Sequence, residues 1–162
     1  MAVIKTDNGQ GKYKNLDAKE KLCRYILRKD AVIHGFCGGV MVDMLAPDES
    51  MQAVSEQFGK ANGVQVRHFI VSFGADEVRD PAVANEIARQ VAAFVGRRYQ
   101  VVYAVHENTE NLHFHLVHNS VSHVDGQRYY GTRGEFRAFR DEVKRVLRQY
   151  GVRVLEYKSS VG

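Results

Sequence analysis

"YQVVYAVHENTENLHFHLVHNSVS" (residues 99–122) contains two apolar runs, residues 99–106 and 112–122, separated by a short polar segment. Apolar runs of this length, rich in Val, Tyr and Phe and joined by a polar turn, are typical of two adjacent antiparallel strands. We therefore predict a β-hairpin at the centre of the fold.

The sequence on both sides of the hairpin predicts further strands and helices. Runs of apolar residues favour strands over residues 2–6, 64–73 and 152–156. Apolar stripes at helical spacing favour helices over residues 17–29, 50–59, 81–95 and 133–150. Residues 31–48, with the segments HGFCGG and AP, are expected to be irregular. Together these elements indicate an α+β fold in which a central antiparallel sheet carries helices mainly on one face.

Three of the predicted helices begin at residues that commonly cap helices. Asp17 with Glu20 resembles a capping box, in which two side chains bond the free backbone N–H groups of the first turn. Thr132 with Glu135 has the same spacing. Asp80 is followed by a proline, which is favoured at the first position of a helix.

The chain of 162 residues has the length and composition of one globular domain, with 44% hydrophobic and 26% charged residues. No stretch approaches the roughly 20 apolar residues of a membrane span, and the N-terminus lacks the apolar core of a secretory signal. Cys23 and Cys37 do not have the spacing of a metal site. We expect a single domain over residues 1–162 that is cytoplasmic and not inserted into a membrane.

The net charge of +4 is concentrated near the C-terminus. Between Gly131 and Gly162, eight Lys and Arg residues stand against four Asp and Glu residues, so this segment alone accounts for the excess. Such an excess occurs on solvated helix faces and also beside polyanions such as nucleic acids. The charge pattern leaves both interpretations open.

Four of the seven histidines lie within the predicted hairpin. Alternate residues of a strand share a face, so His113 and His115 point to the same, less buried side of the second strand. His106 ends the first strand, next to the point where His113 begins the second. The three imidazoles can converge across the hairpin into a three-nitrogen metal site with open positions. His118 is expected to be a polar group on a half-exposed face.

The segment from Val101 to Tyr130 resembles the metal motif of the mobilisation relaxases of the MOBP type, in the HUH endonuclease superfamily. Those proteins carry a histidine at a strand end, a polar turn, and then His-hydrophobic-His on the next strand. An asparagine follows four residues later, before a DG turn and a Lys/Arg-aromatic pair. This chain has the same arrangement in His106, His113, His115, Asn119 and the segment DGQRYY (125–130).

The likeness extends over most of the chain, with two departures. The segment RHFIVSFGADEVRDPAVANEIARQVAAFV (67–95) is similar to the family's strand–loop–helix segment. The family often has an acid two residues after the first histidine and another histidine five residues after it, where this chain has Asn108 and Asn111. Acidic support for a metal ligand is therefore missing at those positions, although Glu107 and Glu110 remain in the turn.

The resemblance implies a metal-dependent, site- and strand-specific DNA nickase that acts by transesterification. In such an enzyme a tyrosine attacks the scissile phosphorus and stays joined to the new 5′ end. The family's nucleophile lies on an N-terminal helix, in a sequence like Tyr-Ile followed by polar or charged residues, and Tyr25 in KEKLCRYILRKD (19–30) matches it. Tyr25 also suits the buried stripe of its helix, and Tyr13 is the local competitor for the role.

The resemblance also implies a cofactor and partners. Mn²⁺ or Mg²⁺ is expected at His106, His113 and His115, where other transition metals can also bind. The expected partner is single-stranded DNA at the origin of transfer of a bacterial plasmid or integrative element, with relaxosome accessory proteins and a coupling protein. The side chains expected to contact DNA are Arg24, Arg28, Lys29, Asn119, Arg128 and Arg133.

Other functions remain open at the level of the sequence. A rolling-circle replication initiator or a single-strand transposase of the same superfamily would share the histidines and the tyrosine. A non-catalytic module would bind single-stranded DNA without forming a covalent product. A three-histidine zinc hydrolase would cleave its substrate without becoming attached to DNA.

Overall fold

A computed structural model describes residues 1–107, 111–155 and 158–160 of the chain. These residues form one six-stranded sheet with the strand order β2-β4-β5-β3-β1-β6. Neighbouring strands run antiparallel, except that β1 and β6 are parallel. The strands are β1 (Val3–Asp7), β2 (Val32–Val40), β3 (Val66–Ser72), β4 (Val101–His106), β5 (His113–Asn119) and β6 (Lys158–Ser160).

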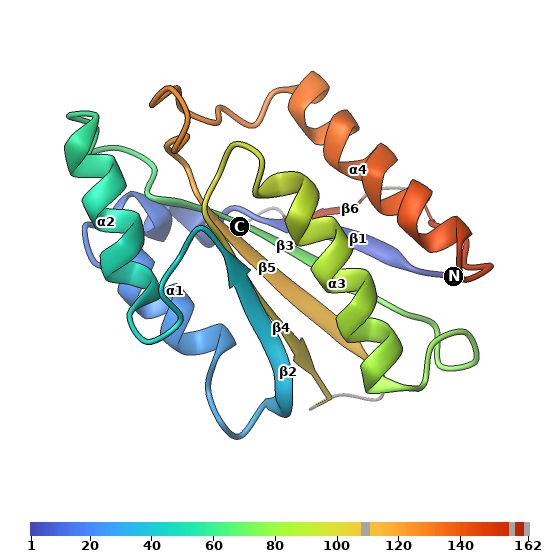
Figure 1. The fold of residues 1–162 in the computed structure, drawn as a ribbon. Helices are drawn as coiled ribbons and strands as arrows, with labels where there is room; N and C mark the ends of the chain where they lie inside the picture. Colours follow the sequence, from blue (N-terminus) through green and yellow to red (C-terminus); the bar gives the residue numbers. More distant parts are fainter. Residues whose placement is uncertain (108–110, 156–157, 161–162) are drawn as a thin grey trace.

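Helices lie against both faces of this sheet, and the two longest share one face (Figure 1). They are α3 (Pro81–Val95) and α4 (Arg133–Arg148). The shorter helices α1 (Ala18–Ile26) and α2 (Pro47–Gln57) lie against the opposite face. A 3-10 helix over Gly9–Lys14 precedes α1 in the chain. The prediction of an α+β fold with a central antiparallel sheet is confirmed. In the described part of the chain the α-helices, which were expected mainly on one face, lie two on each face. Among the described residues, no helix combines the length and the apolar character that crossing a membrane requires.

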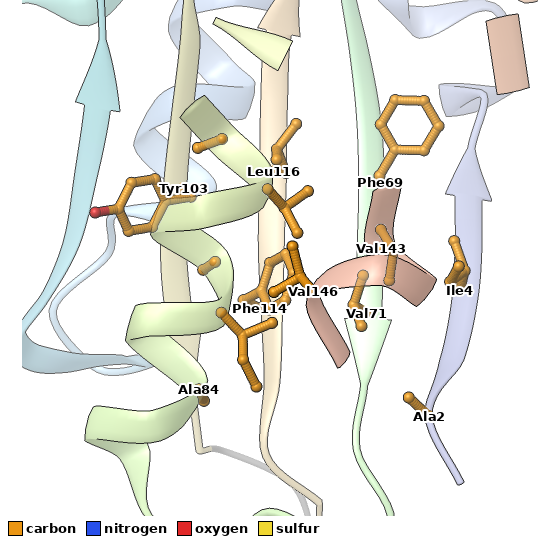
Figure 2. Packing of buried hydrophobic residues seen from close by; sticks show 14 of the residues in the cluster. Ala2, Ile4, Phe69, Val71, Ala84, Tyr103, Phe114, Leu116, Val143 and Val146 are labelled. Atoms are coloured by element: carbon orange, nitrogen blue, oxygen red, sulfur yellow. The ribbon is translucent and has the colours of Figure 1, made fainter. Parts of the chain in front are cut away.

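The larger hydrophobic core lies between the sheet and helices α3 and α4. Figure 2 shows Tyr103, Phe114 and Leu116 of the central hairpin pointing toward α3. Neighbouring strands add Phe69 and Ile4 on the same face. Each buried side chain of this size contributes about 1.5–3 kcal/mol to the free energy of unfolding, so this layer fixes the register of the hairpin.

A smaller core lies on the other face, beneath α1 and α2. It contains Leu22 and Ile26 of α1, Met51 of α2, and the strand residues Ala104 and Val117. Strand residues alternate between faces, so the side chains that continue this layer along β4 and β5 are those of His106, His113 and His115. The fold therefore places these histidines under α1.

The predicted hairpin is present as β4 and β5, which pair antiparallel with His106 directly opposite His113. Residues 108–110 of its polar turn lie outside the described residues. The strands predicted over residues 2–6 and 64–73 are present as β1 and β3. These elements were predictable because each has its own apolar run and its own flanking turn residues.

The prediction of irregular structure over residues 31–48 is wrong for its first part. Residues Val32–Val40 form β2, the edge strand that pairs with β4. The pairing is interrupted between Val32 and Cys37, and Gly35 within this interval has a φ of +81°, which favours glycine. Because an edge strand tolerates glycines and a broken register, the apolar alternation of a regular strand is missing from its sequence.

Two of the three predicted helix caps are formed. The Thr132 hydroxyl accepts from the backbone N–H of Glu135, whose carboxylate accepts from the backbone of Thr132 in return. Asp80 accepts from the backbone at the start of α3. Asp17 forms no such bond, because its carboxylate is paired with Lys21 Nζ at 2.9 Å. The capping box predicted for the first helix is therefore wrong.

The remaining differences concern the ends of elements. The first helix ends at Ile26 rather than at residue 29, and the second begins at Pro47 rather than at residue 50. The predicted last strand over residues 152–156 is reduced to a single parallel bridge between Val154 and Ala2, with β6 following it. Glu156 lies outside the described residues.

His118 is buried rather than half-exposed as expected, with 1% of its surface accessible. The rings of Phe69, Tyr99 and Tyr129 surround it at centroid distances of 6.0, 4.8 and 4.9 Å. Its Nδ1 bonds the carbonyl oxygen of Asn119 at 2.7 Å. Burial lowers the pKa of His118 from its ordinary 6.5 to about 4, so the folded protein holds this imidazole neutral.

Protonation of His118 is expected to destabilise the fold in acid. Its contribution to stability is fully present above pH 6.5 and is lost as the pH falls toward 4, a loss of ~3 kcal/mol in the free energy of unfolding. His118→Phe keeps the ring packing and removes the titrating group. Denaturant unfolding with a chelator present should give a shallower loss of stability in acid for the variant, and equal pH dependence would contradict the prediction.

Candidate active site

The three histidines named from the sequence lie together at one end of the central hairpin. His106 and His113 are opposite each other in the register of β4 and β5, and His115 is opposite Ala104. One ring nitrogen from each imidazole lies within 4.8 Å of the corresponding nitrogens of the other two. The ring centroids of His106 and His115 are 4.3 Å apart. Pairing of two neighbouring strands is sufficient to assemble this cluster.

Each of the three imidazoles uses one ring nitrogen for a hydrogen bond within the protein. His106 Nε2 bonds the carbonyl oxygen of Ile26 at 2.6 Å, and His113 Nδ1 bonds that of Asn111 at 3.2 Å. His115 Nδ1 bonds Nε2 of His68 at 2.7 Å. A neutral imidazole that donates from one nitrogen keeps a lone pair on the other, as a metal ligand requires.

The imidazole nitrogens that do not form these hydrogen bonds are suited to bind a metal ion. His106 Nδ1 is buried and has no hydrogen-bond partner within the described part of the chain. A buried nitrogen without a partner costs about 1–3 kcal/mol, and a bound cation would remove this cost. Three imidazole nitrogens are a common donor set for divalent transition metals, with open positions for substrate oxygens. The residues present therefore suit a divalent ion.

The electrostatics of the cluster keep its imidazoles neutral. The pKa of His115 is lowered to about 2, first by burial and then by the neighbouring histidines His68, His106 and His113. Burial is also the main cause that lowers the pKa of His106 and of His113. Neutral imidazole is the form that binds metals, so the cluster is in its ligating form at neutral pH. The sequence suggested a less buried face, but α1 covers it.

A fourth histidine, not singled out from the sequence, joins the cluster from β3. The ring of His68 is stacked on that of His115, with centroids 5.0 Å apart and an interplanar angle of 24°. Its Nδ1 lies 2.9 Å from the hydroxyl of Tyr13 and 3.5 Å from a carboxylate oxygen of Asp7. The hydrogen bond with His68 is the main cause that lowers the pKa of Asp7 to about 2. Asp7 is therefore a carboxylate at neutral pH.

Tyr25 lies at the edge of the histidine cluster. Its ring meets that of His115 edge-on, with centroids 5.8 Å apart. It is not a core residue, because 48% of its surface is exposed while its helix neighbours Leu22 and Ile26 are buried. The guanidinium of Arg28 lies 4.1 Å from the centre of its ring and donates to its carbonyl oxygen at 2.6 Å. The phenol thus lies beside the cluster and is open to solvent.

Tyr13 occupies a different position in the same region. Its hydroxyl is engaged with His68, and its pKa is raised by burial and by the charge of Asp7. Both effects disfavour the phenolate, which is the attacking form of a tyrosine. Tyr25 is therefore better placed than Tyr13 for attack on a substrate.

Of the six residues named as DNA contacts, three lie close to Tyr25 on or just after α1. Arg24 is exposed and paired with Glu20 at 2.7 Å, Arg28 lies over the Tyr25 ring, and Lys29 is exposed. A positive charge at the end of α1 would face an approaching phosphate. These three side chains give the surface around Tyr25 a basic character, although Arg28 also lies 3.6 Å from a carboxylate oxygen of Asp30.

The other three named residues lie away from Tyr25. Asn119 is fully buried, and its amide bonds the carbonyl of Met51 and the side chain of Gln100. Arg128 donates to the backbone carbonyls of residues 60, 62 and 64. Arg133 is exposed at the start of α4, on the opposite face of the sheet (Figure 1). The first two of these side chains thus hold parts of the protein together.

Comparison with known proteins places this site in a family. The family model "Relaxase: MobA/VirD2-like, nuclease domain" matches residues 25–152, a range that includes Tyr25 and the three histidines. The chain belongs to the relaxase family. This membership supports a relaxase over the replication initiator and the transposase that the sequence left open.

Individual relatives agree with the family match. The group II intron-interrupted relaxase LtrB of Lactococcus lactis subsp. cremoris is 35% identical over 75 residues, which are 46% of this chain and 13% of that protein. Protein rlx of Staphylococcus aureus is 29% identical over 104 residues, which are 64% of this chain and 32% of that protein. The matched part thus spans at most a third of these two relatives.

A solved structure has the same fold. It is described as "Molecular Basis of Vancomycin Resistance Transfer in Staphylococcus aureus" and has a TM-score of 0.51 and 20% sequence identity. The likeness covers 74% of this chain and 73% of that one. At this sequence identity the likeness shows a shared fold, and the chemistry of this chain has to be argued from its own residues.

Proposed function

We propose that this relaxase domain cuts one strand of DNA at an origin of transfer by transesterification and stays joined to it through Tyr25. One observation carries the proposal: the half-exposed Tyr25 ring lies 5.8 Å, centroid to centroid, from that of His115, which is one of three convergent imidazoles. A tyrosine nucleophile beside a cation site is the arrangement that phosphoryl transfer to a phenol needs. The expected partners are single-stranded DNA, relaxosome accessory proteins and a coupling protein.

The proposed metal ligands are His106 Nδ1, His113 Nε2 and His115 Nε2, the nitrogens not used in hydrogen bonds. A divalent ion at these nitrogens supplies a charge that binds phosphate oxygens and offsets the negative charge of the transition state. Mn²⁺ accepts imidazole nitrogen together with oxygen ligands more readily than Mg²⁺ does, and we propose it as the preferred ion.

The protein's own residues would then position the attacking oxygen. Arg28 packs over the Tyr25 ring and bonds its backbone, so the phenol is held against the cluster. Attack forms a bond between the Tyr25 oxygen and phosphorus and breaks the bond from phosphorus to the 3′ oxygen. The phenol gives up its proton and the leaving 3′ oxygen gains one, so no water is consumed. The phosphodiester energy is kept in the phosphotyrosine bond, and the strand can be rejoined.

Phosphates on either side of the scissile bond are proposed to contact the basic side chains near Tyr25. Arg24, Arg28 and Lys29 all lie on or just after α1. Arg133 is proposed as a more distant contact. Asn119 and Arg128 would support binding indirectly, because their polar groups are bonded within the protein.

The proposal is tested by incubating the protein with Mn²⁺ and end-labelled single strands that carry transfer-origin sequences. The fragment with the new 5′ end should migrate with the protein in a denaturing detergent gel, because a phosphotyrosine bond survives denaturation. Cleavage without attachment would instead indicate a metal-dependent hydrolase. Binding without cleavage on every sequence would indicate a non-catalytic binding module.

A further inference from the structure

The sequence of the metal-site turn lacks the acid that relaxases often place near the first histidine, since Asn108 stands there. A carboxylate nevertheless reaches the cluster from another part of the fold. Asp7 at the end of β1 lies 3.5 Å from Nδ1 of His68, and Nε2 of His68 lies 2.7 Å from Nδ1 of His115. Three side chains from three neighbouring strands thus form a row that ends at a proposed metal ligand.

The positions of the protons along this row follow from its two ends. A carboxylate can only accept, so the Nδ1 of His68 carries a proton that points at Asp7 and the Tyr13 hydroxyl. In this tautomer Nε2 of His68 is an acceptor, and the proton between the two imidazoles belongs to Nδ1 of His115. His115 must therefore present the lone pair of its Nε2 to the other two histidines.

His68 itself has no nitrogen left for a metal. Both of its ring nitrogens are within hydrogen-bond distance of protein atoms. Among the described residues, the group of three potential ligands whose atoms all lie within 4.8 Å of one another consists of His106, His113 and His115, without His68. With 2% of its surface exposed, His68 is also closed to substrate. His68 therefore lies behind the proposed metal ligand His115, between it and the carboxylate of Asp7.

We propose that His68, backed by Asp7, is a positioning residue that sets the tautomer and the ring orientation of His115 for binding a divalent ion. The inference rests on the proposed function of the three histidines. Without an acceptor at position 68, the Nδ1–H of His115 would be buried without a partner, and the ring could turn to satisfy it. Partners of this kind change metal affinity by about 10- to 100-fold when they are removed.

The test is Mn²⁺ binding to the purified protein, measured by isothermal titration calorimetry. His68→Phe keeps an aromatic ring against His115 but offers no acceptor, and it should bind Mn²⁺ about 10- to 100-fold more weakly. His68→Gln offers a side-chain oxygen to the Nδ1–H of His115 and should recover most of this affinity. Asp7→Asn removes the charge but keeps an oxygen, so it should lose affinity for Mn²⁺, but less than His68→Phe does.

The absorption spectrum of bound Co²⁺ adds a second measurement, because it responds to the number of nitrogen ligands. Wild type and His68→Phe should have the same spectrum at saturating Co²⁺, since His68 contributes no ligand. A loss of one nitrogen ligand in His68→Phe would overturn the inference by making His68 a ligand itself.

The inference is also overturned if His68→Phe binds Mn²⁺ as tightly as wild type, or if His68→Gln binds no better than His68→Phe. If His68→Phe does not fold, Asp7→Asn provides the test, because Asp7 is only half-buried. An unchanged affinity of Asp7→Asn for Mn²⁺ would reject the proposed row of side chains. Failure of the wild-type protein to bind Mn²⁺ would instead reject the proposed metal site. The two failures are therefore distinguishable.

Discussion

The Tyr25→Phe variant is expected to form the covalent protein–DNA product more than about a thousandfold more slowly than wild type, because the substitution removes the attacking oxygen and nothing else. The Tyr25 ring is half-exposed and packs against Arg28 and His115 through its face and edge, contacts that phenylalanine retains. Folding, Mn²⁺ affinity and affinity for single-stranded DNA should therefore remain close to wild type. The measurement is the denaturing-gel assay with labelled DNA, together with calorimetry of Mn²⁺ binding.

Tyr13→Phe is the matched control, since it removes a phenol oxygen from the same region. That oxygen bonds His68 rather than facing solvent, so the covalent product should persist, with a modest loss of stability of about 1 kcal/mol for the hydrogen bond. If Tyr25→Phe still forms the adduct and Tyr13→Phe does not, the nucleophile is Tyr13 and the assignment to Tyr25 is wrong.

The part of the candidate site that could be predicted from the sequence is the part that is local in the chain. His113 and His115 share a face because strand residues alternate, and His106 stands opposite His113 because one turn joins the two strands. Neither step needs the position of any other strand. The same is true of the caps at Asp80 and Thr132, which depend only on the residues that follow them.

The parts that could not be predicted depend on strand order. His68 is 47 residues from His115 in the chain, and the two meet only because β3 lies next to β5 in the sheet. Asp7 then reaches His68 because β1 is the next strand. The sequence of β3 predicts an apolar strand with one histidine. From this sequence alone, the histidine could point to either face of the sheet, and the strand could pair with any of several other strands. No local pattern distinguishes these arrangements.

Burial of the histidine cluster could also not be predicted from the sequence, for a related reason. The apolar alternation of β5 identifies one strongly apolar face and suggests that the other is open. In the fold, α1 crosses the second face and Ile26 bonds His106 through its carbonyl oxygen. The contact of a helix over residues 18–26 with a strand that ends at residue 106 is a tertiary contact. It buries a site that was expected on the less buried side of its strand.

The double substitution His113→Ala and His115→Ala is expected to remove divalent-ion binding, with an affinity for Mn²⁺ at least about a hundredfold below wild type. It leaves His106 as the one remaining residue of the three proposed ligands, and one imidazole does not hold a divalent ion at micromolar concentrations. Nicking and the covalent adduct should disappear with the ion. Calorimetry of Mn²⁺ binding measures the first effect directly, independently of the DNA reaction.

Thermal unfolding separates loss of the ion from loss of the fold. Because an ion that binds only the folded state raises its stability in proportion to the logarithm of its concentration, saturating Mn²⁺ should raise the Tm of wild type and leave that of the double variant unchanged. His123→Ala is the matched control, since it removes a partly buried histidine that bonds Gly96 away from the cluster. It should keep the Mn²⁺-dependent rise in Tm. An equal rise in the double variant would place the ion elsewhere and reject His113 and His115 as its ligands.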